Sequence, residues 1–435
     1  MVIYEENHSF DNVLGLWCHK NPGRCPDGGM PSRVTLSDGT TVTPTVDPDT
    51  VPVINHNVAS QVAAMNGGAM NGWQSIPSTQ SEGGCSASYS YRCISGYTPS
   101  QIPNLTSLAS AYAVSDMTFS LADSPSWGSH LYAVASSLDR FTGNNPFTPT
   151  GGTSGPGWGC NSDKLADWHS STGKMISIPS CVPDPSLGLS NGGAFKPTPA
   201  SYIPTLMDRL DAAGLSWKIY GARSGQSGYN FATCPSFAEC LDSSQAGNVV
   251  SASQFTTTAS AGNLPAFSLV TPGGSKLNGL PMAGYSCHNG FSMTACDNWV
   301  GQLVSAVEKG PDWSSTAIFI TFDDFGGFYD QVYPGTNSNP DGTQEGPRVP
   351  LIIVSPYAKP GYTDTTRTTF AAILAYTEQN FGLAPLEVND THAYDFSGAF
   401  DYSQAPLKPA RTVTRPLPYS ARHLHLTRAM LDDPS

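Results

Sequence analysis

Positive charge is scarce in this chain of 435 residues, which has 21 Lys and Arg against 34 Asp and Glu and a net charge of −13. This acidic balance argues against a broad binding surface for nucleic acid or anionic membranes, because both would be repelled. No apolar run is long enough to cross a bilayer, so we expect no integral membrane association. No signal peptide is visible, and the chain opens almost inside its first expected strand. We therefore expect a leader to have been removed or to lie upstream.

The Cys-x-x-Cys spacing of structural zinc sites and thioredoxin-like centres is also missing from the ten cysteines. The cysteines fall instead into five couples that are local in sequence and lie in loop-like stretches. This arrangement favours disulfides formed in an oxidising compartment, each contributing on the order of 2–3 kcal/mol. Proximity alone predicts the pairs Cys18–Cys25, Cys85–Cys93, Cys160–Cys181, Cys234–Cys240 and Cys287–Cys296. The expected location is secreted or periplasmic.

Glycine and proline are abundant (43 and 36 residues), which predicts long ordered loops on a compact scaffold. Short apolar strands alternate with amphipathic helices, a pattern typical of a parallel sheet covered on both faces. The expected strands are Val2–Tyr4, Met175–Ile178, Trp217–Tyr220, Phe267–Val270, Ala317–Phe322 and Leu351–Val354. The expected helices start near Pro103, at Ser201, at a cap on Asp297 and at Phe370. The predicted fold is a three-layer α/β/α sandwich with a mostly parallel central sheet.

We expect a single domain over residues 1–403, with residues 140–198 as a loop-rich insertion and residues 404–435 as an unassigned tail. In sheets of this kind, ligands bind beyond the carboxyl ends of the strands.

Two pairs of polar side chains follow directly after expected strands. Glu6-Asn7 comes after the first strand, and Asp323-Asp324 comes after Ala317–Phe322. Either pair alone is more often turn or capping chemistry. Together they predict the two halves of one metal site. Oxygen ligands favour Ca, Mg or Mn, with Zn as an alternative.

A candidate nucleophile lies in the segment from Asp123 to Tyr132, where Ser126 follows Pro125 at the start of a helical run. The helix dipole and free N–H groups there would suit a phosphate or an alkoxide. Ser-Pro-Ser before a helix is also ordinary capping chemistry, and Ser124 and Ser129 are alternatives. No Gly-x-Ser-x-Gly elbow surrounds Ser126, so activation by a metal is more attractive than a base-driven triad.

The segments ENHSFDNVLG (6–15) and TFDDFGGFYDQV (321–332) resemble the two signature segments of the bacterial phosphoesterase family. That family contains non-haemolytic phospholipases C and exported acid phosphatases and is related to the alkaline phosphatase and sulfatase superfamily. Many members carry Arg where this chain has His8 and His where it has Gln331. The resemblance extends to about Tyr402 and includes GPRVP at residues 346–350, where we read Arg348 as scaffold. It implies an alkaline-phosphatase-like fold with long disulfide-tied loop insertions.

The resemblance also assigns roles to individual residues. It implies that Ser126 is the covalent nucleophile. His56 and His288 would bind phosphate or give a proton to the leaving alcohol, and His130 would contact the substrate phosphate where Arg is common.

The function expected is that of an exported phosphoester hydrolase of phospholipase C or acid phosphatase type. It would use one divalent metal held by Glu6, Asn7, Asp323 and Asp324 and a phosphoseryl intermediate. The substrate would be a phosphate ester, with a phospholipid head group among the candidates. Two alternatives remain: a secreted binding protein on the same fold, and a metal-independent acyl esterase.

Overall fold

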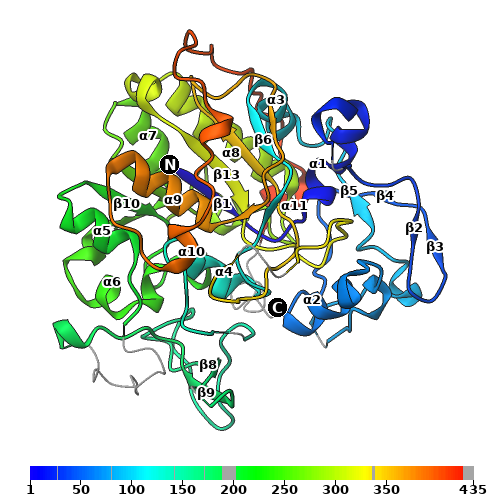
Figure 1. Cartoon of the computed structure of the whole chain (residues 1–435), viewed down its shortest axis with the longest axis horizontal. Coiled ribbons are helices and arrows are strands. Elements are labelled where there is room, and N and C mark those ends of the chain that lie inside the picture. The colour runs from blue at the N-terminus through cyan, green and yellow to red at the C-terminus, as the bar shows by residue number, and fades with distance from the viewer. Residues whose placement is uncertain are drawn as a thin grey trace.

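An eight-stranded sheet forms the centre of the fold (Figure 1). The computed structural model describes residues 1–26, 28–79, 81–141, 143–170, 172–188, 202–335 and 339–424. In spatial order the sheet strands are β11 (Val249–Val250), β10 (Trp217–Tyr220), β12 (Phe267–Val270), β1 (Val2–Glu5), β13 (Ile318–Phe322), β14 (Leu351–Val354), β6 (Ala113–Ser115) and β15 (Thr363–Asp364). β14 is antiparallel to both its neighbours, and the other pairs are parallel. The mostly parallel sheet is thus confirmed.

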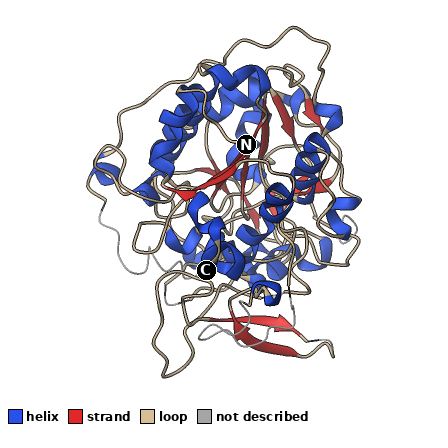
Figure 2. Cartoon of the chain, turned by 90° about the vertical axis from the view of Figure 1, so that its left-hand side faces the viewer, coloured by secondary structure: helices blue, strands red, loops and turns tan. Residues whose placement is uncertain are grey.

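Helices cover both faces of the sheet, as Figure 2 shows for the central strands. The α-helices are α1 (Phe10–Lys20), α2 (Val58–Met65), α3 (Pro103–Ala111), α4 (Ser126–Tyr132), α5 (Leu206–Ala212), α6 (Ala238–Asp242), α7 (Phe255–Ser260), α8 (Met293–Glu308), α9 (Ala371–Phe381), α10 (Val388–Thr391) and α11 (Tyr419–Arg422). Strand β1 shows the layering, because neighbouring side chains of a strand point to opposite faces. Tyr4 packs against Phe370 and donates to the Ser129 carbonyl of α4, whereas Glu5 accepts from the Cys287 N–H near α8. The predicted three-layer sandwich is therefore confirmed.

One expected sheet strand lies elsewhere. Met175–Ile178 forms most of β9 (Met175–Pro179), which pairs antiparallel with β8 (Leu165–His169). This hairpin extends from the body of the molecule and is separate from the central sheet (Figures 1 and 2). The prediction that it belongs with the parallel strands was wrong, because an apolar run specifies strand formation but not which strand it pairs with. Further two-stranded pairings join β2 (Val34–Thr35) to β3 (Thr41–Val42), β4 (Thr45–Val46) to β5 (Ser95–Gly96), and β7 (Thr118–Phe119) to β16 (Thr368–Thr369).

Two helix starts differ from expectation. The expected start at Ser201 lies outside the described residues, and α5 begins after Thr205, whose side chain caps the helix. Helix α8 begins after the cap Ser292, one turn before Asp297. Asp297 does cap a helix, but it is α3: its carboxylate accepts from the Asn104 and Leu105 N–H groups at 3.1 and 3.0 Å. A capping residue can serve a neighbouring helix, which local sequence cannot reveal.

All five predicted disulfides are present. Cys160–Cys181 closes part of the insertion, whose residues 189–198 lie outside the described residues. Short disulfide loops restrict the unfolded chain and so stabilise segments that have little regular structure.

The described part of the tail, residues 404–424, crosses α3 and α8 without regular structure before it reaches α11. Asn104 exchanges hydrogen bonds with the backbone of Val413, and Asn298 does the same with Arg415. The remaining tail residues, 425–435, are outside the described part. The sequence did not predict the structure of this tail. The tail is held through its backbone groups, which every residue has, so its side chains carry no signal of these contacts.

The main apolar core is a continuous cluster that runs from β1 to Phe400, and two small clusters, one around Cys160 and one around Tyr229, are separate from it. Our proposal of a single domain over residues 1–403 rests on this continuity. Among the described residues, no helix is long and apolar enough to span a membrane.

Candidate active site

The two predicted pairs of polar side chains lie together at one edge of the sheet. β1 and β13 are parallel neighbours with their last residues paired, so Glu6-Asn7 and Asp323-Asp324 leave the sheet side by side. The Asn7 backbone N–H donates to Asp323 Oδ1 at 2.8 Å, and the Asp324 N–H donates to the same oxygen at 2.7 Å. All four side chains are fully buried. The structure brings together the four residues that the sequence singled out.

The backbone around this cluster needs special conformations. Asn7 has φ 60°, a left-handed conformation that Asn tolerates better than most residues. Gly326 and Gly327 have φ 61° and 80°. A Cβ at Gly326 would collide with the Asn7 carbonyl. The two glycines after Asp324 therefore allow the two strand-end loops to touch.

Ser126 is the serine that reaches the cluster. It is the first residue of α4 and its Oγ lies 3.1 Å from Asn7 Oδ1. The Ser124 hydroxyl donates to the Pro125 carbonyl at 3.1 Å, and the Ser129 hydroxyl donates to the Ser124 carbonyl at 3.0 Å. The geometry therefore favours Ser126 over the two alternatives.

The first turn of α4 is less open than the sequence suggested. The Trp127 N–H donates to Asn145 Oδ1 at 2.8 Å, so one of the N–H groups expected to face a phosphate is already occupied. Asn145 lies 19 positions after Ser126 in a segment with no periodicity, and no sequence signal pointed to it.

His130 contacts the acidic cluster directly. Its Nε2 lies 2.7 Å from Glu6 Oε1 and 3.9 Å from Asp323 Oδ2. The ring packs edge-on against Tyr4, with centroids 5.1 Å apart. The resemblance placed His130 at the substrate phosphate, whereas here the imidazole lies among the carboxylates proposed to bind metal.

His56 and His288 reach the same cluster from two other segments. His56 Nδ1 lies 2.7 Å from the Ile54 carbonyl, and its Nε2 lies 3.9 Å from Asp324 Oδ2. His288 Nδ1 lies 2.6 Å from the Asn289 carbonyl. Since a carbonyl can only accept, both rings carry a proton on Nδ1, and Nε2 is the nitrogen that faces the cluster.

The cluster has a large excess of negative charge. Burial, together with the charges of Asp324 and Glu6, raises the pKa of the Asp323 carboxyl well above its ordinary value of 3.8. The charge of His130 and the hydrogen bond from the Asn7 N–H act in the opposite direction and lower this pKa. Three carboxyls in a fully buried site need positive charge for all of them to ionise.

The arrangement fits a divalent cation. Glu6, His130 and Asp323 each offer a ligand atom within 4.8 Å of the other two. The Asn7 amide can take two orientations. With its nitrogen towards Asp323, it donates to Asp323 Oδ1 and Oδ2 at 3.0 and 3.2 Å, and its oxygen lies 2.9 Å from His288 Nε2. With its oxygen towards Asp323, the amide could join the carboxylates as a ligand of a cation. The imidazole of His130 adds a nitrogen ligand to the all-oxygen set expected from the sequence. A nitrogen ligand makes Zn a stronger candidate for the bound metal.

Another group of potential metal ligands does not suit a metal ion. It consists of Glu5, Cys287 and Cys296. Both sulfurs are joined in a disulfide and are not available as thiolates.

A buried ion-pair network joins Arg348 to the first turn of α1 and to the segment that follows β13. Arg348 Nη2 lies 3.2 Å from Asp11 Oδ1, and its Nε lies 3.1 Å from Asp330 Oδ1. The guanidinium also donates to the Asp116 carbonyl at 2.8 Å and lies over the Phe10 ring. This confirms the reading of Arg348 as scaffold. Sequence analysis missed Asp11 and Asp330 as its partners, although both lie within the signature segments.

The two positions where this chain departs from many family members have packing roles. His8 is buried, with Nδ1 2.8 Å from Asn12 Oδ1 and Nε2 2.8 Å from the Cys287 carbonyl, and it stacks on Phe328. Gln331 donates to the Gly29 carbonyl at 2.8 Å.

Phe231 covers the histidine side of the site. Its ring stacks on His130 with centroids 6.1 Å apart and lies 5.5 Å from the His288 ring. Ser126, His130 and His288 are all at most 4% exposed. A substrate can therefore reach Ser126 only if covering side chains move, and Phe231, which packs on both rings, is one of them.

Comparison with known proteins identifies relatives. A family model described as the phosphoesterase family matches residues 1–384. A non-hemolytic phospholipase C from Pseudomonas aeruginosa is 25% identical over 248 residues, which are 47% of this chain and 34% of that protein. A non-specific phospholipase C6 from Arabidopsis thaliana is 33% identical over 122 residues, 25% of this chain and 23% of that protein. These alignments span about a third of each relative or less.

Among solved structures, a protein of the alkaline phosphatase superfamily from Vibrio parahaemolyticus aligns with a TM-score of 0.35 and 14% identity, covering 68% of this chain and 64% of that one. A phosphonate monoester hydrolase of Agrobacterium radiobacter aligns with a TM-score of 0.33 and 12% identity, covering 65% and 69%.

Proposed function

The chain belongs to the phosphoesterase family, and from this we propose that it is a metal-dependent phosphoester hydrolase that works through a phosphoseryl intermediate on Ser126. One observation carries the proposal: Ser126 Oγ lies 3.1 Å from Asn7 Oδ1, inside the cluster formed by Glu6, Asp323 and Asp324. A hydroxyl beside a buried group of carboxylates is the arrangement expected when a cation activates the nucleophile.

Glu6, Asn7, Asp323 and Asp324 would hold one divalent cation, with His130 as a further ligand or as the hydrogen-bond partner of Glu6. Bound there, the cation would supply charge neutralisation for the phosphate and would lower the pKa of the Ser126 hydroxyl. Ca, Mg, Mn and Zn all remain candidates on ligand type.

The protein's own residues would divide the chemistry into two displacements. In the first, Ser126 Oγ forms a bond to phosphorus as the bond from phosphorus to the leaving alcohol breaks. In the second, the oxygen of a water molecule bonds to phosphorus and the bond to Ser126 Oγ breaks, releasing phosphate or a phosphomonoester. Asn7 would position the hydroxyl through its amide.

His56 and His288 would manage protons and phosphate charge. Each has Nδ1 held by a backbone carbonyl, which orients Nε2 towards the cluster. When both of its nitrogens carry a proton, either ring could donate the Nε2 proton to the leaving alkoxide or hydrogen-bond to a phosphate oxygen.

The compartment and the substrate class are part of the same proposal. Five disulfides suit an oxidising environment, so we place the protein outside the cytoplasm, either secreted or periplasmic. The substrate would be a phosphate ester, and the names of the relatives bring phospholipids into the set to be tested.

A substrate panel tests the proposal. A chromogenic phosphomonoester, a chromogenic phosphodiester and phosphatidylcholine would be compared with and without a chelator. We expect turnover of at least one of them, loss with chelator and recovery on adding back a divalent metal. Turnover of a phosphate ester that a chelator leaves intact would overturn the metal-dependent mechanism. Release of fatty acid from phosphatidylcholine in the presence of chelator would favour an acyl esterase. Absence of turnover in the metal-loaded protein would favour the binding-protein alternative.

A further inference from the structure

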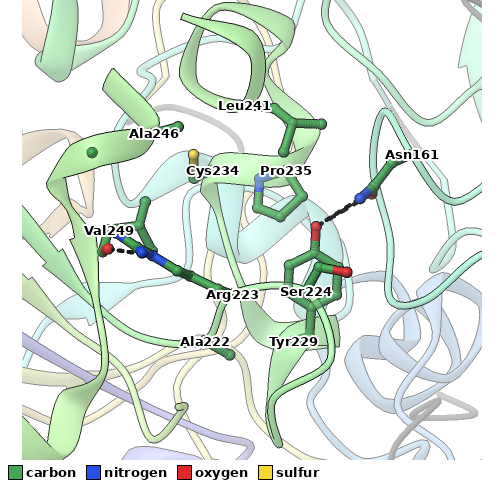
Figure 3. A pocket seen from close by; sticks show the side chains of 11 residues that line it. Asn161, Ala222, Arg223, Ser224, Tyr229, Cys234, Pro235, Leu241, Ala246 and Val249 are labelled. Atoms are coloured by element: carbon green, nitrogen blue, oxygen red, sulfur yellow. Dashed lines mark hydrogen bonds between the residues drawn. The ribbon is translucent and has the colours of Figure 1, made fainter. Parts of the chain in front are cut away.

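A concave site opens near the acidic cluster, beside the residues that follow β10. Its volume is about 430 Å³. Ala222 and Arg223, which follow β10, line one side of it, and Ala246, just before β11, and Val249, at the start of β11, line another (Figure 3). This volume falls within the range of small-molecule sites in proteins, about 300–1,000 Å³. β10 is two strands from β1, or roughly 10 Å at the usual strand spacing.

The walls of this cavity are largely apolar. Pro235, Leu241, Val249 and Ala222 contribute aliphatic surface, and Cys234 adds the disulfide that ties the segment to α6. Such a lining suits an apolar chain or ring rather than a sugar or a nucleotide.

One cation lies at the mouth of the cavity. Arg223 is exposed, and its Nε donates to the Val249 carbonyl at 2.7 Å, which orients the guanidinium along the wall (Figure 3). Within the described ranges, neither Nη atom of Arg223 has a hydrogen-bond or carboxylate partner. In a chain with 21 basic residues against 34 acidic ones, an oriented and unpaired guanidinium beside an apolar cavity indicates an anionic ligand.

The cavity is separated from the reaction centre by a single stretch of chain. Tyr229 and Pro235 line the cavity, and Tyr229 is held by Asn161 through its hydroxyl at 2.9 Å (Figure 3). Between them, Phe231 stacks on His130, and the Thr233 hydroxyl donates to the His130 carbonyl at 3.2 Å. The segment thus presents one set of side chains to the cavity and another to the catalytic centre.

We propose that this cavity binds an amphiphilic carboxylate, a small molecule with an apolar chain and one carboxylate head, at a site distinct from the Ser126 centre. The chain would occupy the space between Leu241 and Val249, and the head would pair with Arg223. A carboxylate is preferred over a phosphate because Arg223 is the single charged residue in the lining, which matches the one negative charge of a carboxylate, whereas a phosphate group carries up to two. The proposal does not depend on the hydrolase activity, since it concerns binding at separate residues.

Calorimetric titration of the full chain with octanoate tests the proposal. We expect saturable 1:1 binding, at least tenfold weaker binding for Arg223→Gln because the charge-assisted pair is lost, and no saturable binding for Ala246→Trp, which fills the cavity. Arg33→Gln, at another exposed arginine, is the matched control and should bind as the unaltered protein does. Circular dichroism would verify that the variants are folded.

Two comparisons locate the site. Octylamine, with the same chain and the opposite charge, should bind at least tenfold more weakly than octanoate. Inorganic phosphate, which we expect at the Ser126 centre, should not displace octanoate. The proposal is overturned if octylamine binds equally well, if Arg223→Gln and Ala246→Trp both retain full binding, or if phosphate displaces octanoate.

Discussion

Replacing Ser126 by alanine tests the assignment of the nucleophile most directly, because the structure separates its expected effects on turnover and on stability. The substitution removes the atom that would bond to phosphorus, so turnover should fall at least on the order of a thousandfold. That ratio corresponds to about 4 kcal/mol of lost transition-state stabilisation.

The expected loss of folding stability is much smaller. Ser126 Oγ makes one hydrogen bond, to Asn7, and a single neutral hydrogen bond contributes about 1 kcal/mol. The Asn7 backbone keeps its bond to Asp323. Ser126→Ala should therefore unfold within about 1 kcal/mol of the unaltered protein and should retain bound metal.

Two neighbouring serines provide matched controls. Ser124 and Ser129 are also buried, and their hydroxyls donate to backbone carbonyls rather than to the cluster. Ser124→Ala and Ser129→Ala should lose a similar amount of stability but keep turnover within about tenfold, since neither hydroxyl reaches the reacting centre.

The assay combines steady-state turnover with acid quenching during turnover. Tandem mass spectrometry of the peptide that spans Ser124, Ser126 and Ser129 should find phosphate on Ser126. Phosphate on either of the other two serines, or substantial turnover by Ser126→Ala, would refute the reasoning.

Three further predictions concern the metal, the Arg348 ion pairs and the pH dependence of stability. Asp323→Ala and Glu6→Ala should each lose metal, measured by plasma mass spectrometry, and activity together; full metal content with near-normal turnover in both would remove the ligand assignment. Arg348→Met should cost about 3–5 kcal/mol in urea unfolding because it leaves two buried carboxyls without their cation, and adding Asp330→Asn should recover part of that loss; no recovery would argue against the charge explanation. Burial and a hydrogen-bonded carboxyl neighbour raise the pKa of Glu378 from 4.5 to about 9. Between these two pH values the folded protein keeps a proton on Glu378 that the unfolded chain loses. The free energy of unfolding should therefore decline as pH rises from about 4.5 to 9. Glu378→Gln should flatten this slope in melting temperatures, and an unchanged slope would contradict the shift.

Five of the eight sheet strands could be predicted from the sequence because they are short apolar runs bounded by turn residues. The other three, β6, β11 and β15, have only two or three residues each and give no such run. Such a run does not specify which other strand it pairs with. Met175–Ile178 has the same appearance as the core strands yet pairs with β8 in an outlying hairpin. Asp297 has the appearance of an N-cap for its own helix yet serves α3. In both cases the local pattern is correct and the partner is set by packing between segments far apart in the chain.

The candidate site could be predicted in part for a related reason. Glu6, Asn7, Asp323 and Asp324 were accessible to sequence reasoning because strand ends converge at one edge of a parallel sheet, a rule that converts sequence position into spatial proximity. No such rule covers Asn145 or Phe231, which come from loops whose paths are determined by tertiary contacts.

His130 shows the limit of carrying a role over by position. Its place in the chain suggested contact with substrate, but the 2.7 Å distance to Glu6 Oε1 makes it part of the acidic cluster. An imidazole there either replaces an oxygen ligand or holds one in place, and the two roles predict different responses to metal identity. If His130 is a ligand, His130→Gln should reduce affinity for Zn more than affinity for Ca, because imidazole nitrogen is a better ligand for Zn. If it only orients Glu6, both affinities should fall by similar factors. Comparative metal titrations of that one variant would therefore assign the role that neither sequence position nor the contact distance assigns alone.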